Sequence, residues 1–164
     1  MKSFLTSSLL LVAIASAAVA GPLEDATTAY QRGDYETAQR LLRPLAEQGN
    51  PVAQYKLGEM YATGKGVRQD YAEAAKLYRL AAEQGDPDGQ ELLGLLYDVG
   101  AGVPRDYVKA HMWLNLAASR YLASEVTKRE VAVETRDLVA SKMTPGQIAQ
   151  AQKLAREWKP KPAR

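Results

Sequence analysis

One pattern of residues occurs twice in this chain at a fixed spacing of 36 positions, and it constrains the fold more than any other feature. The matching pairs are Leu57 and Leu93, Gly58 and Gly94, Tyr61 and Tyr97, Gly64 and Gly100, Gly66 and Gly102, Val67 and Val103, Asp70 and Asp106, Tyr71 and Tyr107, and Ala74 and Ala110. The same shift applied backwards finds a shorter copy between Asp34 and Gly49. Such a period is typical of a protein that stacks one small structural unit several times.

Each unit is predicted to contain two helices joined by a glycine loop. Ala53, Leu57 and Tyr61 recur every four residues, which places them on one face of a first helix from about residue 52 to residue 63. Gly64 supplies the left-handed backbone that ends this helix. Asp70 then begins the second helix by accepting a backbone N–H.

Gly58 lies inside the predicted first helix, where glycine is unfavourable. It costs about 1 kcal/mol relative to alanine at such a position. Because the glycine recurs as Gly94, we expect a neighbouring helix to pack too closely there for a side chain.

The chain is expected to be an all-α protein, because a single helix pair cannot bury its own apolar face and must stack on others. The units are placed at about residues 23–49, 51–86 and 87–121. Residues 122–158 are predicted to form a helical cap, with one stretch from about 123 to 143 and a last helix after Thr144. Thr144 and Gln147 have the spacing of a capping box. We expect an apolar stripe of Ile148, Ala151, Leu154, Ala155 and Trp158 on the last helix, and core packing for Trp113 and Trp158.

The unit A-x-x-x-L-G-x-x-Y-x-x-G-x-G-V-x-x-D-Y-x-x-A, followed by an Ala-Ala pair, resembles the Sel1-like repeat, a branch of the tetratricopeptide-like helical solenoids. The match covers Pro51 to about Ala118, with Gly89 in place of the first alanine in the second full copy. The first unit is shorter and is more similar to a plain tetratricopeptide turn. The resemblance implies a short right-handed solenoid of stacked helix pairs, whose concave side is lined by the first helices. It implies adaptor roles in envelope signalling, polysaccharide export or contact with host proteins, and no shared enzymatic activity.

Residues 1–20 are typical of a secretory signal peptide. Lys2 is followed by an apolar run at residues 9–15, and Ala18-Val19-Ala20 forms an A-x-A cleavage site before Gly21. An N-terminal membrane anchor is the alternative, but the apolar run is shorter than the roughly 20 residues that span a bilayer. We therefore expect an exported protein, periplasmic or secreted. The sequence has no cysteine, which excludes disulfides and lipid attachment through an N-terminal cysteine.

The charge of the chain does not favour nucleic-acid binding. The formal net charge is +2, and the last six residues, 159–164, hold three of the positive charges. The remainder has no basic stripe of the kind that nucleic-acid-binding proteins need. Residues 159–164 are rich in proline and are predicted to form a disordered tail.

No catalytic, cofactor or metal site is predicted. His111 is the only histidine, and neither a nucleophile with its base nor a metal-ligand set accompanies it in the sequence. We interpret it as a packed or solvated residue of a second helix. The sequence also lacks an S-x-x-K motif, an H-E-x-x-H motif and a P-loop.

The outward side of the first helices is the predicted binding surface. It is acidic, contains no lysine or arginine, and carries two apolar anchors. The candidate residues are Tyr55, Glu59, Asp88, Glu91, Leu95 and Asp98. Such a groove suits a basic or neutral peptide or protein segment, and salt should weaken the binding; alternatively, these charges only keep the surface soluble.

The expected function is that of a non-catalytic interaction scaffold or adaptor in the cell envelope, whose protein partner the sequence does not name. A structural or self-associating, stress-protective envelope protein is the alternative, and an envelope hydrolase is a weaker one.

Overall fold

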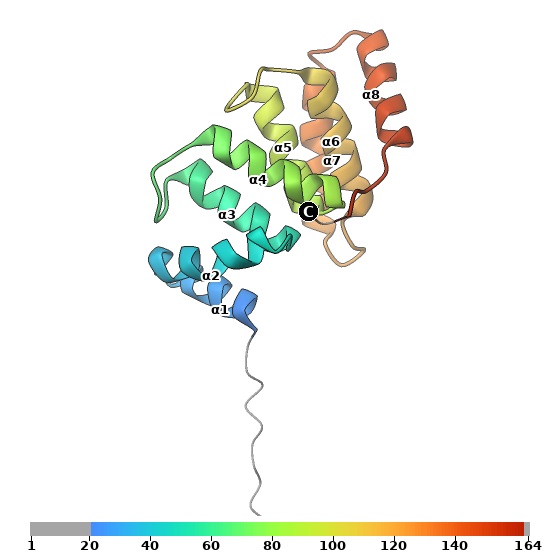
Figure 1. Ribbon diagram of the computed structural model, residues 1–164. Helices are drawn as coiled ribbons and strands as arrows, with labels where there is room; N and C mark the ends of the chain where they lie inside the picture. The colour runs from blue at the N-terminus through green and yellow to red at the C-terminus, as the bar shows by residue number, and fades with distance from the viewer. Residues whose placement is uncertain (1–20, 163–164) are drawn as a thin grey trace, which may run out of the picture.

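The chain is folded as a stack of helices. A computed structural model describes residues 21–162, and the described part contains eight helices and no strand (Figure 1). The helices are α1 (Pro22–Gln31), α2 (Tyr35–Glu47), α3 (Pro51–Thr63), α4 (Tyr71–Gln84), α5 (Pro87–Val99), α6 (Tyr107–Arg120), α7 (Val126–Ala140) and α8 (Pro145–Glu157). The predicted signal peptide lies outside the described residues. Among the helices from residue 21 onwards, none combines the length and the apolar character needed to cross a membrane.

Consecutive helices pack as the pairs α1–α2, α3–α4 and α5–α6, and each pair stacks on the next through contacts of α2 with α3 and of α4 with α5. The last two helices depart from this arrangement, because α7 and α8 both pack on α6. The predicted all-α architecture, with about three repeat units and capping helices, is confirmed.

The predicted helix boundaries follow from local chemistry. The side chain of Asp70 begins α4 by accepting the amide hydrogens of the residues two and three positions later. Asp106 caps α6 in the same way, and Asn50 and Asp86 cap α3 and α5. Gly64 ends α3 with a φ of +69°, in the left-handed region that favours glycine. The repeated polar and glycine positions therefore set where each helix starts and stops.

The close packing expected at Gly58 is confirmed. A Cβ atom at this position would lie 2.6 Å from the ring carbon Cε1 of Tyr78 on α4. One unit later, a Cβ on Gly94 would lie 2.9 Å from Cγ of Leu114 on α6. Both distances are too short for a real contact, so each glycine lets the two helices of a pair approach.

Buried glutamines connect successive units, but not in the same way. Gln54 on α3 donates from its side chain to a carbonyl of α2 and accepts a hydrogen bond of 2.8 Å from Gln84 Nε2 on α4. Gln90, one period after Gln54, donates to a carbonyl of α4. Its Oε1 atom is buried and has no hydrogen-bond partner among the described residues. Arg120 occupies the position that corresponds to Gln84, and its guanidinium lies over the ring of Trp158 instead.

The C-terminal cap matches its predicted helices in outline. The stretch expected from about 123 to 143 forms α7 over residues 126–140, and the capping box of Thr144 and Gln147 is present at the start of α8. Ala151 and Ala155 of the predicted stripe are buried, whereas Leu154 is 38% exposed. The stripe on α8 is thus narrower than expected, because α8 packs mainly on α6 alone.

The two tryptophans pack against each other. Trp113 on α6 is 7% exposed, and its ring meets that of Trp158 edge-on with 6.0 Å between centroids. The residues after Trp158 then run back to the end of α4. The amide of Lys161 donates to the carbonyl of Glu83 over 2.7 Å, and its ammonium lies 3.0 Å from the Glu83 carboxylate. These contacts connect the described part of the predicted tail, residues 159–162, to α4. We call residues 158–162 the C-terminal segment.

Candidate acidic binding pocket

The structure brings four of the six candidate binding residues together. Tyr55 and Glu59 are one turn apart on α3, and Asp88 and Glu91 are about one turn apart on α5. With Leu92, Tyr121 and Lys128 they line a hollow of about 220 Å³, which we call the acidic pocket. The helical repeat explains the grouping, because residues three and four positions apart share one side of a helix.

The other two candidates lie elsewhere. Leu95 is half-buried on α5 and does not line the acidic pocket. Asp98 is at the far end of α5, where its carboxylate forms an ion pair of 2.8 Å with Lys142 after the end of α7. The charge of Asp98 is therefore already balanced within the chain.

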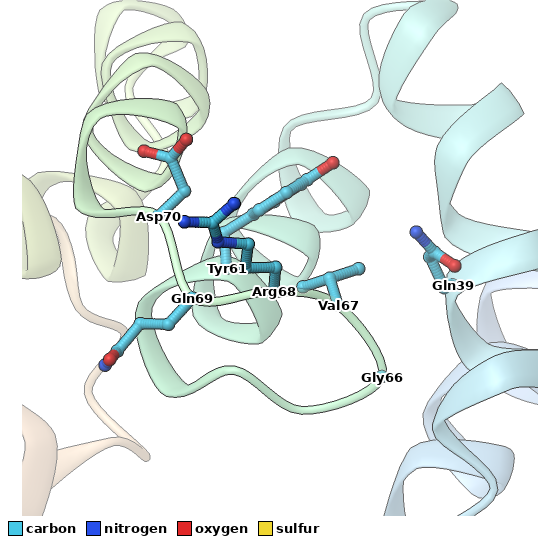
Figure 2. A pocket seen from close by; sticks show the side chains of 7 residues that line it. All are labelled: Gln39, Tyr61, Gly66, Val67, Arg68, Gln69 and Asp70. Atoms are coloured by element: carbon cyan, nitrogen blue, oxygen red, sulfur yellow. The ribbon is translucent and has the colours of Figure 1, made fainter.

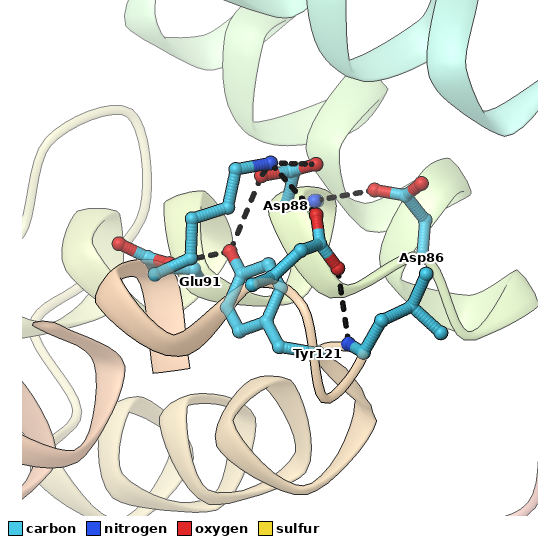
Figure 3. Close-up of polar contacts among 8 residues, drawn as sticks. Asp86, Asp88, Glu91 and Tyr121 are labelled. Carbon is cyan, nitrogen blue, oxygen red and sulfur yellow. Dashed lines mark hydrogen bonds and ion pairs between the residues drawn. The ribbon is translucent and has the colours of Figure 1, made fainter. Parts of the chain in front are cut away.

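Tyr121 and Lys128 complete the acidic pocket, and the repeat pattern does not include them. The hydroxyl of Tyr121 donates to Oε2 of Glu91 over 2.5 Å and lies 3.2 Å from Oδ1 of Asp88 (Figure 3). The ammonium of Lys128 donates to Asp88 over 2.9 Å and lies 3.3 Å from Glu125. These contacts join α5 to the start of α7. The one sequence signal for them is that Tyr121 stands where the helix-ending glycine is expected.

The acidic pocket holds more negative than positive charge. Asp86, the cap of α5, lies beside it, and burial raises the pKa of this carboxyl to about 6, with a further contribution from the nearby charge of Asp88. Burial likewise raises the pKa of Glu59 and of Glu91, although the hydrogen bond from Tyr121 opposes the shift at Glu91. These shifts have the direction expected where carboxylates lose contact with water.

The tyrosine and the lysine respond to the same field. Burial raises the pKa of the Tyr55 hydroxyl, and the charges of Asp88, Asp86 and Glu59 raise it further. Burial lowers the pKa of Lys128, but the hydrogen bonds and charges of Asp88 and Glu125 together outweigh this effect, and the net shift is upward. Lys128 therefore stays charged and is the one cationic side chain that lines the acidic pocket.

Glu59 differs from the other carboxylates of the acidic pocket. It is half-buried, and no lysine, arginine or histidine among residues 21–162 lies within 4 Å of its carboxylate oxygens. Asp88 is paired with Lys128, and Glu91 accepts from Tyr121. Glu59 thus has no direct cationic partner among the described residues, and only the more distant charges of lysines 56, 65 and 128 oppose the effect of burial on its pKa.

A larger hollow than the acidic pocket lies beside the loop between α3 and α4 (Figure 2). It measures about 630 Å³ and is lined by Gln39, Tyr61, Gly66, Val67, Arg68, Gln69 and Asp70. Its polar side chains are largely occupied by the loop itself, since Asp70 caps α4 and Gln69 donates to the carbonyl of Ala62 and to Tyr71. We therefore regard it as part of the repeat architecture.

His111 is 4% exposed on α6, and burial lowers its pKa. Arg136 and Asp137 are the charged groups that act on it. Across the described residues, no three histidine, aspartate or glutamate side chains are grouped in a way that could hold a metal ion.

Comparisons with known proteins agree with this architecture. No curated protein sequence matches the chain. Among solved structures, a protective antigen of uropathogenic Escherichia coli strains with an SLR fold superposes with a TM-score of 0.76 at 31% identity, and a Sel1 repeat protein from Oxalobacter formigenes with a TM-score of 0.64 at 27% identity. Each alignment covers 84% of this chain, which spans only 29% of the first structure and 56% of the second.

The family model for the Sel1 repeat matches residues 28–50, 51–86 and 87–121. These three segments make up more than half of the chain. The second and third correspond to the pairs α3–α4 and α5–α6, and the first covers the end of α1 and all of α2. The chain belongs to the Sel1 repeat family.

Proposed function

We propose that this protein is an adaptor that binds a basic or neutral segment of another protein at the acidic pocket. Sel1 repeats are typically non-catalytic helical scaffolds for protein interactions, and the acidic pocket is the surface that we propose for this role. The proposal includes export to the cell envelope, which rests on the signal-peptide pattern of residues 1–20.

The carboxylate of Glu59, which has no direct ion-pair partner among residues 21–162, carries the proposal. Partial burial deprives this group of water and raises its pKa, and the more distant charges of Lys56, Lys65 and Lys128 offset this effect only in part. A lysine or arginine of a partner would supply that charge, and the gain is larger in a partly desolvated pocket than on an open surface.

Apolar surface beside Glu59 would add affinity. Tyr55 and Leu92 are half-buried and line the same hollow. Tyrosine is common at binding hot spots because it combines a large apolar ring with a polar end. A partner segment with a cation next to an apolar residue fits these two features together.

Self-association remains the alternative function, because apolar side chains are exposed on the last part of the stack. Leu122, Val131 and Leu138 are 67%, 44% and 65% exposed. Analytical ultracentrifugation distinguishes the two functions: an adaptor remains a monomer until its partner is added, whereas a self-associating protein forms larger species alone.

The decisive experiment compares two charge reversals in a crosslinking pull-down from the cell envelope, followed by titration of the purified partner. The bait begins at Gly21. Glu59→Lys should weaken binding on the order of tenfold, equivalent to about 1.4 kcal/mol. Glu36→Lys makes the same charge change at an exposed position of α2 and should leave the affinity unchanged. Equal affinity of both variants would reject the acidic pocket as the binding site.

Glu91→Lys is a less suitable variant, because Glu91 also accepts the hydrogen bond from Tyr121. Export is tested separately by intact mass of the protein recovered from the periplasm or the medium, which should begin at Gly21. A full-length protein retained in the cytoplasm would contradict this part of the proposal.

A further inference from the structure

The repeat produces two related grooves between successive second helices, one between α2 and α4 and one between α4 and α6. The 36-residue shift relates Glu47 to Glu83 and Leu77 to Trp113. Differences between the two grooves therefore come from their side chains.

The C-terminal segment covers the later position. The ring of Trp158 packs edge-on against the buried indole of Trp113 on α6, and a Cβ on Gly85, at the end of α4, would lie 3.7 Å from the Trp158 ring and 3.8 Å from Pro160. Three residues after Trp158, Lys161 pairs with Glu83 and donates its amide to the carbonyl of the same residue. An aromatic ring, an extended chain with prolines and a lysine thus cover this part of the stack.

The earlier groove is open. It encloses about 310 Å³ between α2 and α4, and its lining residues are Arg43, Ala46, Glu47, Leu57, Tyr61, Glu73, Lys76, Leu77 and Leu80. The floor of the groove is formed by the apolar side chains of Leu57 and Leu77, which are largely buried. Leu77 is smaller than the equivalent Trp113, so it leaves more space. Glu47 is exposed at the rim and has no ion-pair partner in the described part of the chain.

We propose that the groove between α2 and α4 is a second docking site, which takes an extended partner segment with an aromatic side chain and, three residues later, a lysine flanked by prolines. The aromatic ring would occupy the floor over Leu77, and the lysine would pair with Glu47. The C-terminal segment shows at the equivalent position that this chemistry fits the fold. Prolines favour such binding because they hold the segment extended before it binds.

This site is separate from the acidic pocket. Leu57 and Tyr61 present one side of α3 to the groove, whereas Tyr55 and Glu59 present another side to the acidic pocket. The proposal therefore does not depend on the proposed function, and either can fail without the other.

The test uses the intact chain from Gly21 and a fluorescein-labelled peptide with the sequence Arg-Glu-Trp-Lys-Pro-Lys-Pro, which copies residues 156–162. Fluorescence anisotropy should show saturable binding that is lost when the peptide tryptophan is replaced by alanine. Glu47→Lys should weaken binding at least fivefold. Glu36→Lys makes the same charge change at an exposed position of α2 that lines neither the groove nor the acidic pocket, and it should leave the peptide affinity unchanged.

Several results would overturn the proposal. They are the absence of binding, binding that Glu47→Lys leaves unchanged, and binding that depends on Glu83 instead, which would mean that the peptide only displaces the C-terminal segment. Thermal unfolding checks that each variant is folded. Because Glu47 is exposed, Glu47→Lys leaves the core intact and decides the outcome.

Discussion

The second and third units, residues 51–86 and 87–121, share one backbone pattern but differ where they face the rest of the molecule. Both have a capped first helix, a glycine against the partner helix and a glycine loop. At equivalent positions, Leu77 of the second unit is replaced by Trp113 in the third, and Gln84 by Arg120. The cap of the first helix is Asn50 for the second unit and Asp86 for the third. On its far side the third unit packs against the helices of the cap and not against a further repeat. Its contact residues therefore differ from those of the second unit, although the backbone pattern is the same.

The largest expected effect comes from a loop glycine that is tighter in the third unit than in the second. A Cβ on Gly102 would overlap the backbone carbonyl of Tyr71, whereas one on Gly66 would lie 2.7 Å from Cβ of Tyr35. Both glycines have positive φ. Gly102→Ala should lower the free energy of unfolding by about 3 kcal/mol and Gly66→Ala by about 2 kcal/mol. Urea unfolding measures both losses of stability. Equal losses would show that the two loops adjust equally well to the added methyl group.

Trp113→Leu makes the third unit resemble the second. It removes most of a buried indole and the edge contact with Trp158, so we expect a loss of about 2 kcal/mol. Thermal unfolding followed by circular dichroism measures it. Trp158→Leu serves as the comparison. Trp158 is only partly buried, so this substitution should lower the free energy of unfolding by less. The reverse order would mean that the C-terminal segment contributes more than the core beneath it.

The glutamine pair gives a smaller difference between the units. Gln84→Leu leaves Oε1 of the buried Gln54 without a donor and should cost about 1–2 kcal/mol. Arg120→Leu removes only the stacking on Trp158 and should cost about 0.5–1 kcal/mol, because Gln90 Oε1 is already unpartnered. Chemical denaturation of the two variants side by side tests this order. A larger loss of stability for Arg120→Leu would indicate that Arg120 also donates a hydrogen bond to Gln90 Oε1 in solution.

The smallest expected effect is a gain in stability that depends on pH. The pKa of Asp86 is raised by burial from 3.8 to about 6. Its contribution to stability is therefore fully present below about pH 4 and is lost as the pH rises through 6. Asp86→Asn copies the cap Asn50 and removes this loss, which we expect to be on the order of 1 kcal/mol because the group is partly exposed.

The measurement is the free energy of unfolding from pH 4 to pH 8 for Asp86→Asn and the parent protein. Glu59 and Glu91 titrate in both proteins, so the difference between the two curves isolates Asp86. Parallel curves would contradict the shifted pKa.

The regular part of the fold was predictable because its determinants repeat. Gly58 and Asp70 have counterparts 36 residues later, and each has a local physical reason that acts within one helix pair. The capping box at Thr144 is equally local. Such features depend only on neighbouring residues and on the next helix, so the sequence contains all that is needed to infer them.

The acidic pocket was predictable only in part. Tyr55 and Glu59 follow from helical spacing, but Tyr121 reaches the acidic pocket from the end of α6 and Lys128 from the first turn of α7. The pairing of Asp98 with Lys142 has the same origin. The course of α7 lies outside the repeat period, so counting along one unit does not reveal which carboxylates it neutralises.

The return of the C-terminal segment to α4 affects how the molecule comes apart. In an open stack each unit contacts only its neighbours, and the ends fray independently of the middle. Here the bonds between Lys161 and Glu83 tie the end of the chain to the second unit and bypass the third. The third unit is thereby enclosed within a loop of contacts. Local opening of α5 and α6 has to break or strain the contacts between Lys161 and Glu83. Hydrogen exchange of the backbone amides in α5 and α6 should therefore approach the rate set by global unfolding.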